Sequence, residues 1–119
     1  MLTRIRLILA TAVLAFGLAS LVHAGILFGD FEHSAAATAE GVIAIVVIVG
    51  LLGTFARSAS ARGIAFAALG FALLGTLVGA FTIAVGVGPQ STPDILFHGL
   101  LVVGLVAGLV VTWRMRRIG

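Results

Sequence analysis

The stretch AAATAEGVIAIVVIVGLLGTFA, residues 35–56, decides the fold of this chain. Glu40 is its one charged residue. Because an α-helix rises about 1.5 Å per residue, the stretch is long enough to cross a hydrocarbon core of about 30 Å. Three further apolar runs cover residues 7–28, 63–87 and 95–113. The sequence therefore predicts an all-α integral membrane protein, a four-helix bundle that residues 1–119 form as a single domain.

The composition of the whole chain agrees with four spans. Of its 119 residues, 61% are hydrophobic and 9% are charged, and the mean hydropathy is +1.31. A soluble domain has about 25% charged residues and too little interior to hide this much apolar surface. The composition excludes a soluble enzyme and a nucleic-acid-binding protein, and it indicates a lipid bilayer as the surroundings. No loop is long enough to form a catalytic site outside the bilayer, so an enzyme is the less expected class.

The charges are divided unequally between the two sides of a four-span topology. All seven basic residues are arginines, and all of them fall on one side, whereas the acids of the loops fall on the other. Arginine-rich segments stay on the cytoplasmic side, so both termini and the middle loop are predicted to be cytoplasmic. The arginines are Arg4, Arg6, Arg57, Arg62, Arg114, Arg116 and Arg117, and the acids are Asp30, Glu32 and Asp94.

The N-terminal segment has an alternative interpretation. Two arginines, an apolar stretch and the small-residue pattern Val22-His23-Ala24 also resemble a signal peptide of residues 1–24. The apolar run continues through residues 25–28 and is longer than a usual signal-peptide core, which favours a retained first span. Cleavage would leave three spans and remove His23.

Glu40 and the histidines are the polar residues that point to function. A carboxylate inside a span is costly unless it is paired or protonated, so Glu40 is expected to face the bundle interior. We expect His23 one to two turns inside the outer end of the first span, and His98 about one turn inside that of the fourth. At about 1.5 Å per residue, the three side chains lie at nearly the same depth.

Two more residues lie near these three. His33 begins the second span and shares a helix face with Glu40, two turns further on. Asp94 shares a face with His98, four residues later. Asp94 also has a structural role, because Thr92 is the predicted N-cap and a carboxylate in the first turn complements the helix dipole.

These side chains allow three kinds of chemistry. Two histidines and a carboxylate are ligands for iron, zinc, copper or manganese, so we predict a metal site of His23, Glu40 and His98, with His33 and Asp94 as additional or supporting groups. One haem b with His23 and His98 as axial ligands is an alternative, although no arginine is available on the outer side for its propionates. A proton or ion relay through Glu40 is the third.

The segment from Gly70 to His98 carries a resemblance. It contains GFALLGTLVG at 70–79, FTIA at 81–84, GVGP at 86–89, then Pro93-Asp94 and His98. This pattern resembles an uncharacterised family of short, four-span bacterial membrane proteins. The resemblance covers about a quarter of the chain, and it implies a four-span fold in a bacterial inner membrane and no particular activity.

Three functional hypotheses follow from these features. The first is a redox or metal-handling membrane protein. The second is an accessory subunit of a larger membrane complex or a homo-oligomer, held by the small-residue pairs Gly75/Gly79 and Gly104/Gly108, although packing within the monomer is the favoured role of those glycines. The third is a small proton-coupled transporter that works through Glu40, similar in size to small multidrug transporters, which carry their glutamate in the first span.

Overall fold

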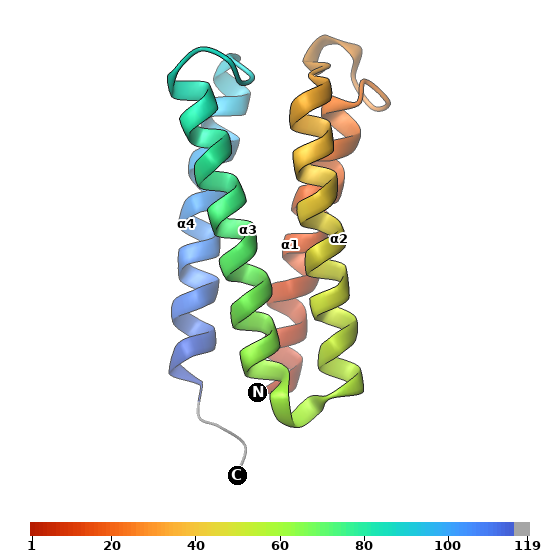
Figure 1. Ribbon diagram of the computed structural model, residues 1–119, viewed down its shortest axis with the longest axis vertical. Coiled ribbons are helices and arrows are strands. Elements are labelled where there is room, and N and C mark those ends of the chain that lie inside the picture. The colour runs from red at the N-terminus through yellow and green to blue at the C-terminus, as the bar shows by residue number, and fades with distance from the viewer. Residues whose placement is uncertain (116–119) are drawn as a thin grey trace.

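A computed structural model describes residues 1–115 of the chain and contains four long α-helices (Figure 1). They are α1 (Leu2–His23), α2 (Ser34–Ala56), α3 (Ala61–Ala84) and α4 (Thr92–Arg114). Short 3₁₀ turns, Gly29–Phe31 and Ser58–Ser60, lie between the first three. All four helices are long and apolar enough to cross a membrane, which indicates a multi-pass membrane protein and confirms the predicted all-α bundle. Arg116 and Arg117 lie outside the described residues.

Two helices end earlier than predicted, and glycine is the reason. Gly25 and Gly86 have φ of +75° and +80°, a backbone conformation that glycine adopts without strain. In both turns the glycine N–H and the N–H that follows it donate back to the last turn of the helix, as in a Schellman motif. His23 is therefore the last residue of α1, and the prediction that placed it one to two turns inside the span was wrong.

The four helices form an open bundle. Each helix packs along the one that follows it in the chain, whereas α1 and α4 touch only slightly. The open seam is an apolar groove of about 740 Å³ that α1 and α4 line. The N-terminus, the C-terminal end of α4 and the α2–α3 connection lie at one end of the long axis, and the other two connections lie at the opposite end (Figure 1). We call these the arginine end and the histidine end.

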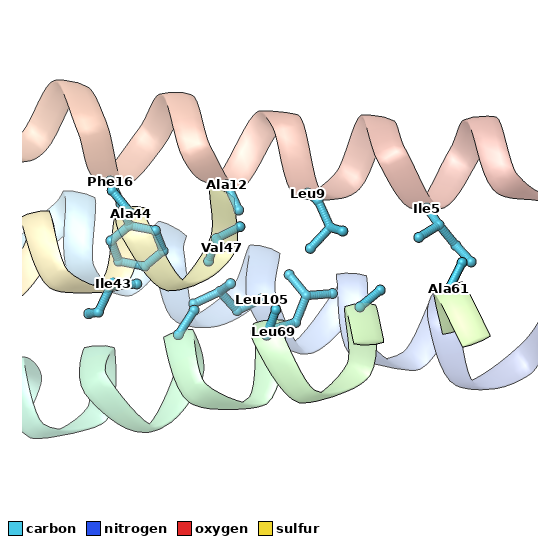
Figure 2. Close-up of a cluster of buried hydrophobic side chains, with 13 residues drawn as sticks. Ile5, Leu9, Ala12, Phe16, Ile43, Ala44, Val47, Ala61, Leu69 and Leu105 are labelled. Carbon is cyan, nitrogen blue, oxygen red and sulfur yellow. The ribbon is translucent and has the colours of Figure 1, made fainter. Parts of the chain in front are cut away.

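Buried residues follow a stripe along each helix. On α1 they are Ile5, Leu9, Ala12, Phe16, Ala19 and His23. The alternating spacing of three and four residues keeps all of them on one face of a helix. This apolar stripe packs against Val47 of α2, Leu69 of α3 and Leu105 of α4 in the middle of the bundle (Figure 2).

The arginine end is held by arginine contacts to helix carbonyls. Arg6 of α1 donates to the carbonyl of Thr54 at 3.0 Å and stacks over the ring of Phe55 at 3.8 Å. Arg62 of α3 donates to the carbonyl of Met115 at 3.0 Å. A cation at the C-terminus of a helix complements the helix dipole, so these side chains are stabilising where they lie.

Glycines allow close approach of neighbouring helices. A Cβ atom on Gly50 would lie 2.7 Å from the Cβ of Ala68 on α3, and one on Gly75 would lie 2.6 Å from Ile43 on α2. Gly79 faces His98, and Gly108 faces Ile8 and Leu69, whereas Gly104 has no such neighbour within 4 Å. Packing within the monomer is thus confirmed for three of the four glycines in the predicted small-residue pairs.

Replacement of Gly50 tests the α2–α3 contact. We expect Gly50→Ala to lower the free energy of unfolding by about 1–3 kcal/mol, because the new methyl group overlaps a methyl group on a packed helix. Gly70→Ala is the matched control, since its Cβ meets nothing within 4 Å. It should be neutral or stabilising by up to about 1 kcal/mol, through helix propensity. Denaturant unfolding in detergent measures both, and equal effects would contradict the close contact.

Candidate functional site

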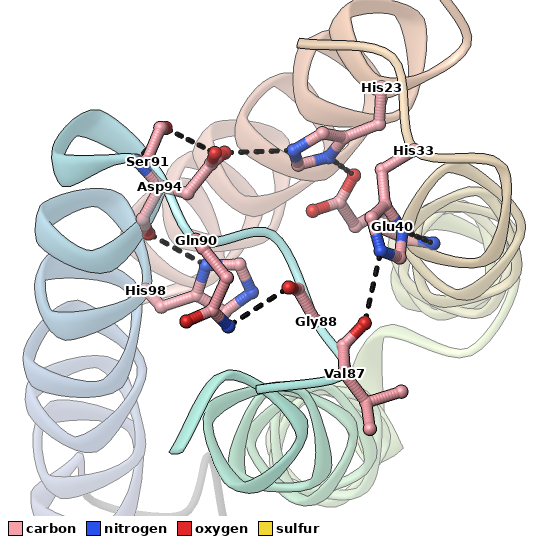
Figure 3. Close-up of polar contacts among 10 residues, drawn as sticks. His23, His33, Glu40, Val87, Gly88, Gln90, Ser91, Asp94 and His98 are labelled. Carbon is pink, nitrogen blue, oxygen red and sulfur yellow. Dashed lines mark hydrogen bonds and ion pairs between the residues drawn. The ribbon is translucent and has the colours of Figure 1, made fainter. Parts of the chain in front are cut away.

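The imidazole of His23 lies between two carboxylates at the histidine end of the bundle (Figure 3). Its Nδ1 is 2.7 Å from Oε2 of Glu40 on α2, and its Nε2 is 2.9 Å from Oδ1 of Asp94 on α4. The three side chains are buried, with exposed fractions of 2%, 5% and 8% for His23, Glu40 and Asp94. We call these three residues the triad. Its members come from three helices, so the fold of the whole bundle is needed to form it.

The buried stripes explain why these side chains meet. His23 continues the α1 stripe four residues beyond Ala19. Glu40 begins the α2 stripe that goes on to Ile43, and Asp94 begins the α4 stripe that goes on to His98. On α1, α2 and α4, the last buried position at the histidine end is therefore a polar residue, and the three polar side chains face one another.

Asp94 has a complete set of partners. Its Oδ1 contacts His23, and its Oδ2 accepts a short hydrogen bond from the hydroxyl of Ser91. The Asp94 N–H donates to the Ser91 oxygen at 3.2 Å. Ser91 is therefore the N-cap of α4, and the prediction of Thr92 was one residue too late. Asp94 lies in the first turn, as predicted, where the helix dipole stabilises its negative charge.

Glu40 has one oxygen without a partner. Oε2 contacts His23, but Oε1 is buried and has no hydrogen-bond partner among the described residues. The free oxygen points toward the side of the bundle that carries Asp94 and His98 (Figure 3). Glu40 lines a cavity of about 160 Å³ between α2, α3 and α4, which we call the Glu40 pocket. A buried polar atom without a partner is costly, so Oε1 needs a hydrogen from a proton, a water or a ligand.

The other two predicted histidines lie beside the triad. The Nδ1–H of His98 donates to the carbonyl of Asp94 at 2.9 Å, and no hydrogen bond within the described chain joins His98 to His23 or Glu40. His33 is the N-cap of α2, where its Nδ1 accepts from the N–H of Ala36. Its Nε2–H donates to the carbonyl of Val87 at 3.3 Å, which ties α2 to the α3–α4 connection.

Hydrogen counting gives the triad a net charge of −1 when only its two internal contacts hold a hydrogen. Each of the two contacts between the His23 ring and a carboxylate needs one hydrogen. With both hydrogens on the ring, His23 carries +1 and each carboxylate carries −1. With one of them on a carboxyl group, His23 and that carboxyl are neutral and the other carboxylate carries −1, so the sum is the same. The triad thus carries a net charge of −1, and a third hydrogen on Glu40 Oε1 makes it neutral. The described arginines all lie toward the arginine end, so none of them compensates this charge.

The predicted metal ligands are only partly brought together. His23 and Glu40 are in contact, but both ring nitrogens of His23 face carboxylates, and His98 is bound through Nδ1. In residues 1–115 no group of three or more His, Cys, Asp or Glu side chains has an arrangement that holds a metal ion. The Glu40 pocket is also smaller than the roughly 300 Å³ of ordinary cofactor sites. The metal, haem and accessory-subunit hypotheses stay predictions.

The direct contact between His23 and Asp94 was not predicted from the sequence. The prediction placed Asp94 at the start of α4, where it lies, and expected its carboxylate to support His98, with which it forms no hydrogen bond. The backbone carbonyl of Asp94 accepts from His98, while the carboxylate contacts His23. The spacing of the buried residues on α4 could have indicated this contact, because it places Asp94 on the buried face of the helix.

Comparison of the chain with protein-family models, with curated proteins and with solved structures finds no match.

Proposed function

We propose that this protein is a small proton-coupled transporter in which the triad is the proton-binding site. One observation carries the proposal: His23 joins two buried carboxylates, and the second oxygen of one of them, Glu40 Oε1, has no partner in residues 1–115. Ionisable groups inside membrane spans are expensive, and they commonly mark proton and ion pathways. We assign the exchangeable proton to Glu40, because both carboxylate oxygens of Asp94 already have partners, whereas Glu40 Oε1 has none within the described chain.

The charge of the triad supplies the coupling. A net charge of −1 inside an apolar bundle is costly, and either a proton or a bound cation removes it. Proton and cation therefore compete for the same place, which is the requirement for exchange of one against the other. The groups that face Glu40 are His23 from α1, Asp94 and His98 from α4, and His33 at the start of α2. The α3 wall contributes no titratable side chain.

Proton binding is the first step to test. Infrared spectroscopy of the purified protein in detergent should show the carbonyl band of a buried carboxylic acid, and this band should disappear as the pH is raised. Acid–base titration should count one proton per chain over the same pH interval. A wild-type protein without that band at any pH at which it stays folded would overturn the proposal.

Transport is the second step. The protein is reconstituted into liposomes that contain a pH-sensitive dye, and sodium, potassium or methylammonium chloride is added outside. At least one of these cations should drive proton movement that protein-free liposomes do not show. Proton movement equal to that of protein-free liposomes for all three, under an imposed pH gradient, would count against a transporter.

We further propose a bacterial inner membrane as the location, with both termini cytoplasmic. The charge distribution supports this, because arginines gather at the end that holds the N-terminus and the α2–α3 connection. The triad then lies near the outer, periplasmic side.

The absence of cysteine allows a direct test of this topology. We expect a single cysteine at Ser58, between α2 and α3, to resist a membrane-impermeant maleimide added to intact cells. A cysteine at Gly29, between α1 and α2, should be labelled under the same conditions. Gel shift after labelling measures both, and the reverse pattern would invert the proposed orientation.

A further inference from the structure

The polar groups that line the Glu40 pocket are mainly hydrogen-bond acceptors. The hydroxyl hydrogens of its threonines are already donated to backbone carbonyls of α3. The hydroxyl of Thr76 donates to the carbonyl of Ala72 at 2.8 Å, and that of Thr82 donates to the carbonyl of Gly79 at 2.7 Å. Both hydroxyl oxygens keep lone pairs, and both residues line the pocket. The α3 wall therefore accepts hydrogen bonds and has none to give.

The two histidines of the pocket have fixed tautomers. His98 Nδ1 faces a carbonyl, which only accepts, so Nδ1 carries the hydrogen and Nε2 has the lone pair. His98 Nε2 lies on the pocket side, against Gly79. His33 accepts from a backbone N–H at Nδ1, so its hydrogen is on Nε2 and is donated to Val87. In its ionised state, Glu40 adds a third acceptor type, the partnerless Oε1.

We infer that the Glu40 pocket binds a small protonated amine, with ammonium as the smallest member of the class. This inference rests on the proposed function and names its substrate class. The ligand has to donate several hydrogen bonds and carry one positive charge, since the pocket offers a carboxylate, an imidazole lone pair and two hydroxyl oxygens. A cavity of about 160 Å³ has room for an ammonium group with a short alkyl chain. Phe16, Ile43 and Leu101 provide apolar wall for that chain.

Other cations fit these acceptors less well. Hard cations prefer several oxygen ligands, whereas one of the acceptors here is an imidazole nitrogen. A quaternary ammonium has no N–H, so it leaves Glu40 Oε1 and His98 Nε2 without donors, and it is held by aromatic cages that this pocket lacks. An ammonium group can donate to Glu40 Oε1 and to the acceptors nearest to it in the pocket, and its charge brings the triad to neutrality.

The experiment uses displacement of the Glu40 proton. The purified chain is held at the pH where the buried-carboxyl infrared band is half-maximal, and methylammonium chloride is added at constant pH. We expect the band to decrease with a saturable dependence as Glu40 ionises and its proton leaves to the buffer. Tetramethylammonium and sodium chloride at the same concentrations should leave the band unchanged.

A pair of variants tests the role of the pocket wall. Thr76→Val removes one acceptor at nearly constant shape, and it should weaken methylammonium about tenfold without changing the pH at which the band is half-maximal. Thr112→Val is the matched control, because Thr112 is a buried threonine far along α4 from the pocket, and its hydroxyl has no partner in the part of the chain that the structure describes. It should leave the methylammonium affinity unchanged.

The outcomes separate the inference from the function on which it rests. Displacement by tetramethylammonium or sodium as strong as that by methylammonium would overturn the amine assignment, as would no displacement by methylammonium. In both cases a normal pH titration of the band leaves the proton-binding triad intact. A missing band overturns both.

Discussion

Glu40→Gln is expected to abolish the protein-dependent proton movement in liposomes, to the level of protein-free vesicles. Glutamine keeps the shape of the side chain and still contacts His23, but it has no exchangeable proton and no charge. The variant should therefore stop both proton uptake and the electrostatic attraction of a cation. Titration should find no proton uptake per chain where the wild type takes up one, and the buried-carboxyl infrared band should be absent.

Folding does not confound this result. The substitution removes a buried charge, so Glu40→Gln should be at least as stable as the wild type. Glu32→Gln is the matched control, because Glu32 is an exposed carboxylate at the same end of the bundle. It should keep wild-type proton movement. If the Glu40→Gln protein still moves protons at more than about a tenth of the wild-type rate, Glu40 does not take part in proton coupling.

The fold was predictable because hydrophobic length alone determines it. The spans are long apolar runs in which Glu40 is the one charged residue, and in a bilayer such a run has to satisfy its backbone within a helix. The ends of the spans were less predictable, because α1 and α3 stop where Gly25 and Gly86 enter the left-handed region, inside the apolar runs. An apolar residue after such a glycine looks the same in a hydropathy pattern as one before it.

The sequence predicted the relative depth of the site residues in the membrane, but it did not predict how each helix is rotated about its own axis. Residue count placed His23 and Glu40 at one level, and they are in contact. Depth also suggested His98 as the third member, but the second partner of the imidazole is Asp94. Rotation about the α4 axis decides between them, and the spacing of Asp94, His98 and Leu105 gives that rotation once the buried face is known. No sequence pattern predicted that His23 of α1 would contact Asp94 of α4 as well as Glu40 of α2.

His23→Leu is expected to lower the free energy of unfolding by about 3–5 kcal/mol at a pH where both carboxylates are ionised. Removal of one partner from a buried ionic cluster leaves the others without compensation, and this costs more than the cluster itself contributes. The loss should shrink as the pH falls, because protonation of Glu40 and Asp94 removes their charges. Denaturant unfolding in detergent at two pH values measures the effect. His33→Leu, at the half-buried N-cap of α2, is the control, and it should lose only about 1 kcal/mol, the usual contribution of an N-cap.

The double variant His23→Leu with Glu40→Leu distinguishes a functional cluster from a structural one. Replacement of a buried ion pair by apolar side chains is often neutral or stabilising, and Asp94 keeps Ser91 and the start of α4 as partners. The double variant should therefore recover most of the stability that the single variant loses, while proton movement stays absent. Recovery of stability without recovery of function means that the bundle does not need the triad to fold. A double variant no more stable than His23→Leu would instead make the triad a structural clamp between α1, α2 and α4.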